Sequence, residues 1–132
     1  MADALFGKTW NMNGAASIFS AAVKPNTETR KYEEIPNGYK LTVSGTRNGQ
    51  PYSWGYTALY DGKPHAVTGR DDVDAITAYR CDDQVTVGFF TNKGVDGGAY
   101  GRATLDGRNL KVIAAGKDAS GSPYFDVIQY TA

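Results

Sequence analysis

The sequence predicts an all-β protein, a single antiparallel up-and-down β-barrel of about eight to ten strands with one short N-terminal helix. Turn dipeptides recur along the chain, as at Asn48-Gly49, Asp61-Gly62 and Asp106-Gly107. Residues of these types accept the positive φ of two-residue hairpins. Between the turns lie short runs rich in Val, Ile, Thr, Tyr and Phe, each about the length of a strand.

Strand-length runs can be placed in order along the whole chain. They are Leu5–Met12, Thr27–Glu34, Tyr39–Thr46, Tyr52–Tyr60, Pro64–Thr68, Ala75–Cys81, Val85–Asn92, Ala99–Leu105, Asn109–Lys117 and Tyr124–Tyr130. The links between successive runs are mostly short, which favours antiparallel neighbours. A meander of this length exposes two edges unless its ends pair, so we expect it to close into a barrel.

One segment has the composition of a helix. Gly14–Ala22 reads GAASIFSAA, with alanines and apolar residues at helical spacing, and Pro25 would end a helix soon after it. No linker or low-complexity tract interrupts the chain. We therefore expect residues 1–132 to form one domain around one core.

Alternation along the predicted strands separates the two faces of the sheet. The clearest case is the run Tyr52–Tyr60, where one face carries only Ala and aromatic residues. These residues are Tyr52, Trp54, Tyr56, Ala58 and Tyr60. An aromatic stripe with a period of two residues can line a cavity for a flat ligand, or it can simply fill the barrel core.

The charge balance makes some partners unfavourable. Lys plus Arg number 14, and Asp plus Glu also number 14, so the chain has no general attraction for nucleic acid or for anionic membranes. No apolar run is long enough for membrane insertion, and the first residues, MADALFGKTW, lack the features of a signal peptide. With Cys81 as the single cysteine, we expect a cytoplasmic protein, or a periplasmic one if a leader has been removed.

Four side chains are candidates for polar chemistry. His65 is the single histidine, the residue type that commonly serves as a general acid or base, and Asp126 lies mid-strand between Tyr124 and Ile128; either could act as a general acid or base. Arg80 shares a predicted strand face with Ile76 and Ala78, and Arg102 shares one with Tyr100 and Thr104. An inward guanidinium at either position would need a carboxylate or an anionic ligand. For all four the alternative is an ordinary surface position.

The sequence favours neither a metal site nor a cofactor. Asp71-Asp72-Val73-Asp74 lacks the glycine and the distal glutamate of a calcium loop. One His and one Cys do not make a zinc signature, and no glycine-rich phosphate loop is present. We expect Asp71 to Asp74 to form a solvated loop, and we expect no metal and no cofactor.

Several stretches resemble a known superfamily. FGKTW at residues 6–10 resembles the Gly-x-Trp or Gly-Thr-Trp start of the first strand in calycins (lipocalins and fatty-acid-binding proteins), with one extra residue before Trp10. Residues 27–69, the later AYRCDD strand and the GKDASGSPYFDVIQY terminus are similar to small bacterial lipocalin-like proteins. The resemblance implies an up-and-down barrel that can enclose a ligand.

The chain also departs from the fatty-acid-binding proteins. The segment 13–26 has room for one short helix, not for their helix-turn-helix lid. Their final Arg-x-Tyr, which grips a carboxylate, is matched only by Tyr130, because Ile128 stands where the arginine would be. A fatty acid is therefore a less favoured ligand than another small apolar molecule.

Three functions follow as hypotheses. The first is binding of a small hydrophobic or aromatic molecule inside the barrel. The predicted ligand-binding residues are Trp54, Tyr56, Tyr60, Arg80, Phe90, Tyr100, Arg102, Tyr124 and Tyr130. The second is a cofactor-free lyase, isomerase or cyclase that uses the same cavity, with His65 or Asp126 as acid or base. The third is a filled barrel that binds another protein; the chain could be a monomer or a homodimer.

Overall fold

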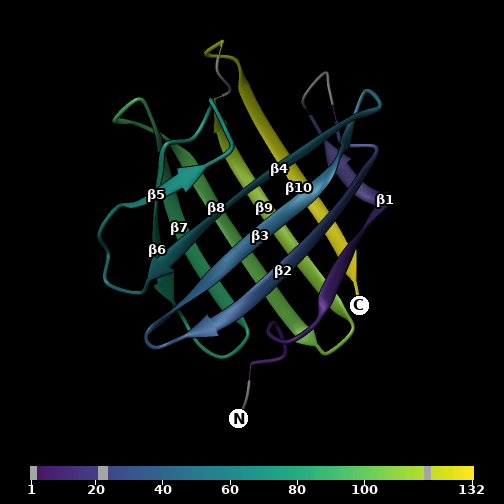
Figure 1. Cartoon of the computed structure of the whole chain (residues 1–132), viewed down its shortest axis with the longest axis vertical. Coiled ribbons are helices and arrows are strands. Elements are labelled where there is room, and N and C mark those ends of the chain that lie inside the picture. Colours follow the sequence, from purple (N-terminus) through teal and green to yellow (C-terminus); the bar gives the residue numbers. More distant parts are fainter. Residues whose placement is uncertain (1–2, 21–23, 118–119) are drawn as a thin grey trace.

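The computed structural model describes residues 3–20, 24–117 and 120–132. These residues form ten strands in one antiparallel sheet, which closes on itself because β1 pairs with β10 (Figure 1). The strands are β1 (Thr9–Phe19), β2 (Thr27–Ile35), β3 (Gly38–Arg47), β4 (Gln50–Leu59), β5 (His65–Thr68), β6 (Ala75–Arg80), β7 (Val85–Asn92), β8 (Val95–Asp106), β9 (Asn109–Lys117) and β10 (Pro123–Thr131). Every strand pairs with its neighbours in sequence, so the predicted up-and-down barrel is confirmed.

The predicted helix at Gly14–Ala22 is wrong. None of the described residues is helical, and accordingly they contain no helix that could span a membrane. Most of the segment belongs to β1, where a long bulge shifts the pairing with β10. The Ser17 hydroxyl donates to the Asn13 carbonyl oxygen (2.7 Å) and accepts from the Gln129 N–H (2.9 Å). The Ser17 hydroxyl thus satisfies backbone groups of β1 and β10 at the bulge. Residues 21–22 of the predicted helix lie outside the described residues.

Tight turns fix the register of the hairpins. Asn48 and Gly49 join β3 to β4 with φ of 52° and 76°, the pair of positive angles that a type I′ turn requires. Lys93 and Gly94 join β7 to β8 with φ of 54° and 77°. Turns of this kind match the twist of the flanking strands, so the inward and outward faces are continuous around the wall.

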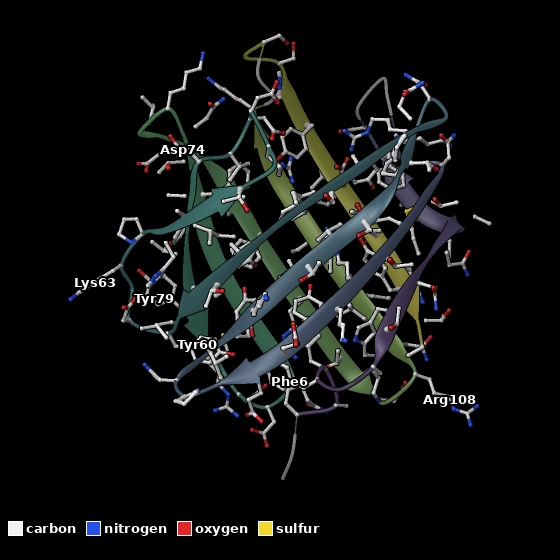
Figure 2. All side chains as sticks on the ribbon, viewed as in Figure 1. Phe6, Tyr60, Lys63, Asp74, Tyr79 and Arg108 are labelled. Carbon is white, nitrogen blue, oxygen red and sulfur yellow. The ribbon has the colours of Figure 1, made fainter. Side chains whose placement is uncertain are left out.

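The N-terminal segment seals the lower end of the barrel in Figure 1. Leu5 and Trp10 are buried, and the Trp10 Nε1–H donates to the Leu5 carbonyl oxygen at 2.9 Å. The buried Arg102 guanidinium donates to both carboxylate oxygens of Asp3, at 3.2 and 2.5 Å. Figure 2 places Tyr60 toward the same end. The N-terminal segment therefore closes this end of the barrel.

The wall is paired unevenly around the barrel. The shortest strand, β5, meets β4 through the pairs Gly55–Thr68 and Tyr56–Val67. It meets β6 through His65–Ile76 and Ala66–Ala75. Other neighbouring strands, such as β3 and β4, pair along most of their length. A shallow groove follows the outer surface between β4 and β5.

Candidate ligand cavity

A cavity of about 320 Å³ opens at the end of the barrel opposite the N-terminal segment. Its polar lining residues are Glu28, Arg30, Arg47, Arg70, Asp72 and Asp126, and its apolar or aromatic ones are Phe19, Pro25, Trp54, Val112, Ala114, Tyr124 and Ile128. A narrow extension of about 70 Å³ continues inward between Tyr56, Val67, Ile76, Phe90 and Tyr100. The volume is at the lower end of the range for small-molecule sites, and the mixed lining is typical of them.

Trp54 on β4 is the central wall of this cavity. The Arg70 guanidinium lies 4.6 Å from the centroid of its ring system, and the Arg30 guanidinium lies 5.4 Å from it. Arg30 also lies 5.1 Å from the Tyr130 ring. A cation over an aromatic face is attracted by the ring quadrupole. These contacts hold the two guanidinium groups and the indole in fixed positions around the cavity.

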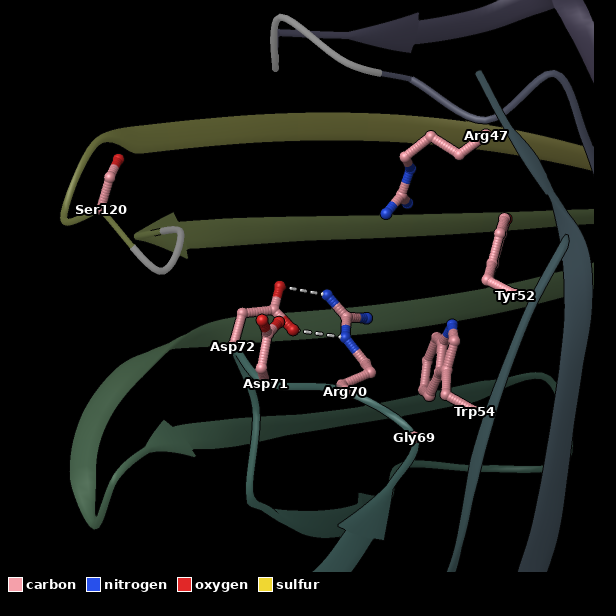
Figure 3. A pocket seen from close by; sticks show the side chains of 8 residues that line it. All are labelled: Arg47, Tyr52, Trp54, Gly69, Arg70, Asp71, Asp72 and Ser120. Carbon is pink, nitrogen blue, oxygen red and sulfur yellow. Dashed lines mark hydrogen bonds and ion pairs between the residues drawn. The ribbon is translucent and has the colours of Figure 1, made fainter. Parts of the chain in front are cut away.

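The mouth carries two arginines with different surroundings (Figure 3). Arg70 donates to both carboxylate oxygens of Asp72, from Nε at 2.7 Å and from Nη2 at 2.6 Å. Partial burial alone would raise the pKa of Asp72, but the hydrogen bonds and charge of Arg70 lower it. Arg47 extends from the end of β3, with its guanidinium 4.9 Å from the Tyr52 ring. The entrance therefore holds charges of both signs.

Glu28 is a buried carboxylate with three side-chain donors. It accepts hydrogen bonds from the Tyr52 hydroxyl (2.7 Å), from Arg30 Nε (3.1 Å) and from the Tyr130 hydroxyl. Burial would raise the pKa of Glu28, but the Arg30 charge and the bonds from Tyr130 and Tyr52 outweigh it and lower the pKa. Gly45 leaves the space that the Tyr52 phenol occupies. The carboxylate is therefore ionised at neutral pH and fixes Arg30 beside the cavity.

Below the cavity, three tyrosine hydroxyls form a chain. The Tyr39 hydroxyl lies 2.6 Å from the Tyr56 hydroxyl and 3.2 Å from the Tyr100 hydroxyl. Burial is the main cause that raises the pKa of Tyr100 to about 12, so its hydroxyl keeps its proton at neutral pH. These groups can exchange hydrogen bonds with a neutral polar atom of a ligand without carrying charge themselves.

Two glycines, Gly98 on β8 and Gly116 on β9, make room for the ring of Phe90 in the barrel wall. A methyl group on Gly98 would lie 2.7 Å from Phe90 Cζ, and one on Gly116 would lie 2.9 Å from the same atom. The Phe90 ring therefore lies directly against the backbone of β8 and β9. This close approach keeps the ring in the wall and leaves the inner extension unfilled.

Asp126 on β10 is a carboxyl group at the cavity wall with an altered pKa. Partial burial raises its pKa, and this effect exceeds the lowering by the Ser20 N–H, which donates to Oδ1 at 3.2 Å, and by the charges of Arg47 and Arg70. A carboxyl with a raised pKa takes up and releases a proton closer to neutral pH than an ordinary aspartate.

The structure brings together most of the predicted ligand-binding residues. Trp54, Tyr56, Phe90, Tyr100 and Tyr124 line the cavity or its inner extension. Tyr130 is buried next to them and donates to Glu28. Tyr60 and Arg102 lie at the sealed end instead, where Arg102 is paired with Asp3. Arg80 lies at the outer surface, paired with Asp83.

His65 lies away from the cavity. Its Nε2 atom is 3.0 Å from Asp61 Oδ1, in the link between β4 and β5. The residue contributes to the shallow outer groove between those strands and is not among the residues that line the cavity. A role for His65 in acid–base chemistry inside the barrel stays a prediction without a contact to support it.

Five charged residues of the cavity were not predicted from the sequence. They are Glu28, Arg30, Arg47, Arg70 and Asp72. In β2 the outer face carries Lys31 and Glu33, so both faces of the strand are charged and alternation gives no preference. The available signal was strand parity, because Glu28 and Arg30 lie on the same face of β2 as the inward Tyr32. Arg70 and Asp72 belong to a link for which the sequence predicts only a solvated loop.

Comparison of the chain with protein-family models, with curated proteins and with solved structures found no match. The closed antiparallel barrel is compatible with the calycin-like fold that the sequence resembles. Membership of that superfamily stays a prediction.

Proposed function

We propose that this chain binds a small planar molecule, with an apolar or aromatic body, in the cavity at the open end of the barrel. The observation that carries the proposal is the cavity of about 320 Å³ with Trp54 as its wall and Arg30 and Arg70 beside the indole. A flat ligand can stack on an exposed part of this wall, and the aliphatic residues Val112 and Ile128 offer apolar contact.

The polar groups suggest how such a ligand would be oriented. Arg47 and Arg70 at the mouth favour a ligand whose polar or anionic atoms point outward. The phenols of Tyr56 and Tyr100 favour at most a neutral hydrogen-bonding atom at the inner end. The narrow extension admits only a small substituent, so we expect compact one- or two-ring molecules rather than long acyl chains.

The two tryptophans of the chain allow a direct test. Trp54 lies in the cavity wall and Trp10 lies in the sealed end. In Trp10→Phe protein, 1-anilinonaphthalene-8-sulfonate and a panel of small aromatic acids should change the remaining Trp54 fluorescence saturably, with at least one probe binding at micromolar level. In Trp54→Phe protein the remaining Trp10 fluorescence should not respond. Response of Trp10 alone would contradict the proposal.

A cavity-filling variant distinguishes this site from the outer groove. Ala114 lines the cavity, whereas Ala66 contributes to the groove between β4 and β5. Ala114→Leu should weaken probe binding about tenfold or more by removing space, and Ala66→Leu should leave it unchanged. The opposite pattern would assign binding to the outer groove and exclude the cavity.

Asp126 favours a second candidate function, a cofactor-free lyase, isomerase or cyclase. Its carboxyl lies at the cavity wall with a raised pKa, next to the positive charges of Arg47 and Arg70 that could stabilise developing negative charge. In a substrate screen, turnover that depends on Asp126 should fall by about two to four orders of magnitude in Asp126→Asn protein. Unchanged turnover would remove Asp126 from the chemistry.

A further inference from the structure

The outer surface of the barrel is polar on one side and apolar on the other. On β2 to β4 most outward positions are polar or charged, as with Lys31, Glu33, Lys40, Thr42 and Thr57. On β6 to β10 the strand pairing aligns two outward rows that carry no charge. One row is Thr77, Phe89, Ala99, Ala115 and Phe125. The next row is Tyr79, Val87, Gly101, Ile113, Val127 and, on β1, Ile18.

This apolar face has a ridge and a trough. Phe89 is 58% exposed and packs edge to face against Tyr79, with ring centroids 6.4 Å apart. A groove of about 880 Å³ is lined by this ridge and by small residues of β6, β8 and β9, with Ala99 directly opposite Ala115. A contiguous apolar surface of this kind marks an interaction site more often than a solvated wall.

The exposed area agrees with the size of a small protein interface. Six large apolar or aromatic side chains on the face are exposed by 39% to 61%. At about 150–200 Å² for each whole side chain, they present ~550 Å², against about 800 Å² per partner in a standard interface. The small and polar residues between and around them supply the rest.

We propose that this face is the interface of a homodimer. A two-fold axis that passes between the Phe89 ridge and the trough would place each Phe89 in the trough of the other copy, over Ala99 and Ala115, so the face is complementary to itself. The edges of the face carry both signs, with Lys111 and Lys117 on β9 and Asp96 on β8. A surface for anionic lipid would instead be rimmed by basic residues.

Sedimentation equilibrium across a concentration series tests the proposal on the full chain. Wild-type protein should associate to a dimer at micromolar concentration, and Phe89→Lys should raise the dissociation constant about thirtyfold or more. Phe89→Thr, which keeps a strand-favouring residue, should weaken the dimer in the same direction. Thr42→Lys adds the same charge on the polar side of the barrel and should leave association unchanged. Circular dichroism and thermal unfolding check that each variant is folded.

Three outcomes would overturn the proposal. The first is a wild-type protein that stays monomeric at hundreds of micromolar, well above the expected dissociation constant. The second is a dimer that Phe89→Lys and Phe89→Thr leave intact, which would assign association to another surface. The third is a monomer that floats with phosphatidylcholine–phosphatidylglycerol vesicles through Phe89, which would assign the face to a membrane. Ligand binding in the barrel is measured separately and does not affect these results.

Discussion

Glu28 and Asp126 are two carboxyl groups at one cavity whose surroundings change their pKa values in opposite directions. Glu28 has a cation and two phenols as hydrogen-bond donors, which favour its ionised form. Asp126 lies partly buried, which favours its protonated form and outweighs the single backbone N–H that donates to it. The two residues therefore contribute to stability with opposite dependence on pH.

The effect of Glu28 should be largest at neutral pH. Because its folded pKa is lowered, its contribution is complete above the unfolded pKa and is lost as the pH falls through the folded value. Glu28→Gln should cost about 3 kcal/mol at neutral pH, since it leaves Arg30 buried without its carboxylate. In urea unfolding, the difference from wild type should shrink as the pH falls below the ordinary range of a glutamate pKa. The control is Glu33→Gln on the outer face of β2; a pH-independent loss in Glu28→Gln would contradict the expectation.

Asp126 should show the reverse behaviour. Because its folded pKa is raised, ionisation weakens the folded state, and the wild type gains stability as the pH falls through the folded pKa. Asp126→Asn keeps an oxygen acceptor for the Ser20 N–H and removes the ionisation. Its urea midpoint should exceed that of wild type at neutral pH, and the advantage should disappear in acid. A variant that is less stable than wild type at neutral pH would show that the charges of Arg47 and Arg70 outweigh the burial.

Among the elements, β8 has a strict packing requirement at one position. Its inward Gly98 lies against Phe90 and the backbone of β9, so a methyl group there would push against the Ala115 carbonyl oxygen and the Phe90 ring. Gly101 on the same strand has its nearest side-chain atom at 3.5 Å, an ordinary contact distance. The strand therefore offers a crowded glycine and an uncrowded one.

We expect Gly98→Ala to destabilise the fold by about 2–3 kcal/mol through overpacking and backbone displacement. Gly101→Ala should change the free energy of unfolding by less than about 1 kcal/mol. Chemical denaturation of both variants at a protein concentration below that of dimer formation measures the difference. Equal losses would mean that strand propensity, and not contact with Phe90, sets the cost.

Regular strands were predicted from the sequence better than the irregular, bulged part of β1 was. Val, Tyr and Thr between Asn-Gly and Asp-Gly turns locate most of the strands, because these residues fit a pleated surface and the turns fix its register. The exception is β1, which was predicted as Leu5–Met12 and is Thr9–Phe19. GAASIFSAA was predicted as a helix from its composition, and the error comes from Ser17, whose hydroxyl bonds to backbone groups of β1 and β10. Such a bond depends on a strand more than a hundred residues away, which local propensity does not contain.

The same limit applies to the site. Period-two alternation located Trp54 and Tyr56 because β4 is apolar on one face. Alternation could not distinguish an inward arginine from an outward one. Arg80 shares the parity of the buried Ala78, but it ends its strand and pairs with Asp83 at the surface. Arg102 instead points inward and pairs with Asp3. The partner of Arg102 is 99 residues away in sequence, so its inward orientation follows from the closed fold and not from its neighbours.

On the scale of the whole molecule, the Asp3–Arg102 pair lies at the sealed end of the barrel and does not line the cavity. Both side chains are about 95% or more buried. Asp3→Ala leaves the guanidinium without its carboxylate and should cost about 3 kcal/mol in the free energy of unfolding. Arg80→Ala, which removes the exposed Arg80–Asp83 pair, should cost about 0–1 kcal/mol.

Probe binding should separate the two ends further. Folded Asp3→Ala protein should bind the aromatic probes with wild-type affinity, because Asp3 does not contribute to the cavity lining. Fluorescence titration below the unfolding transition measures this. A large loss of affinity in the folded variant would show that the sealed end and the cavity are coupled.

The sparse pairing of β5 has a consequence for the rates of exchange. A strand held by two residue pairs on each side opens more often than strands that are paired along their length. Amide protons of β5 should therefore exchange with deuterium before those of β3 or β9. If a ligand leaves the cavity through an opening at β5 rather than through the mouth, its residence time will follow the opening rate of β5. Additional pairing between β4 and β5 will then lengthen that residence time without changing any residue that touches the ligand.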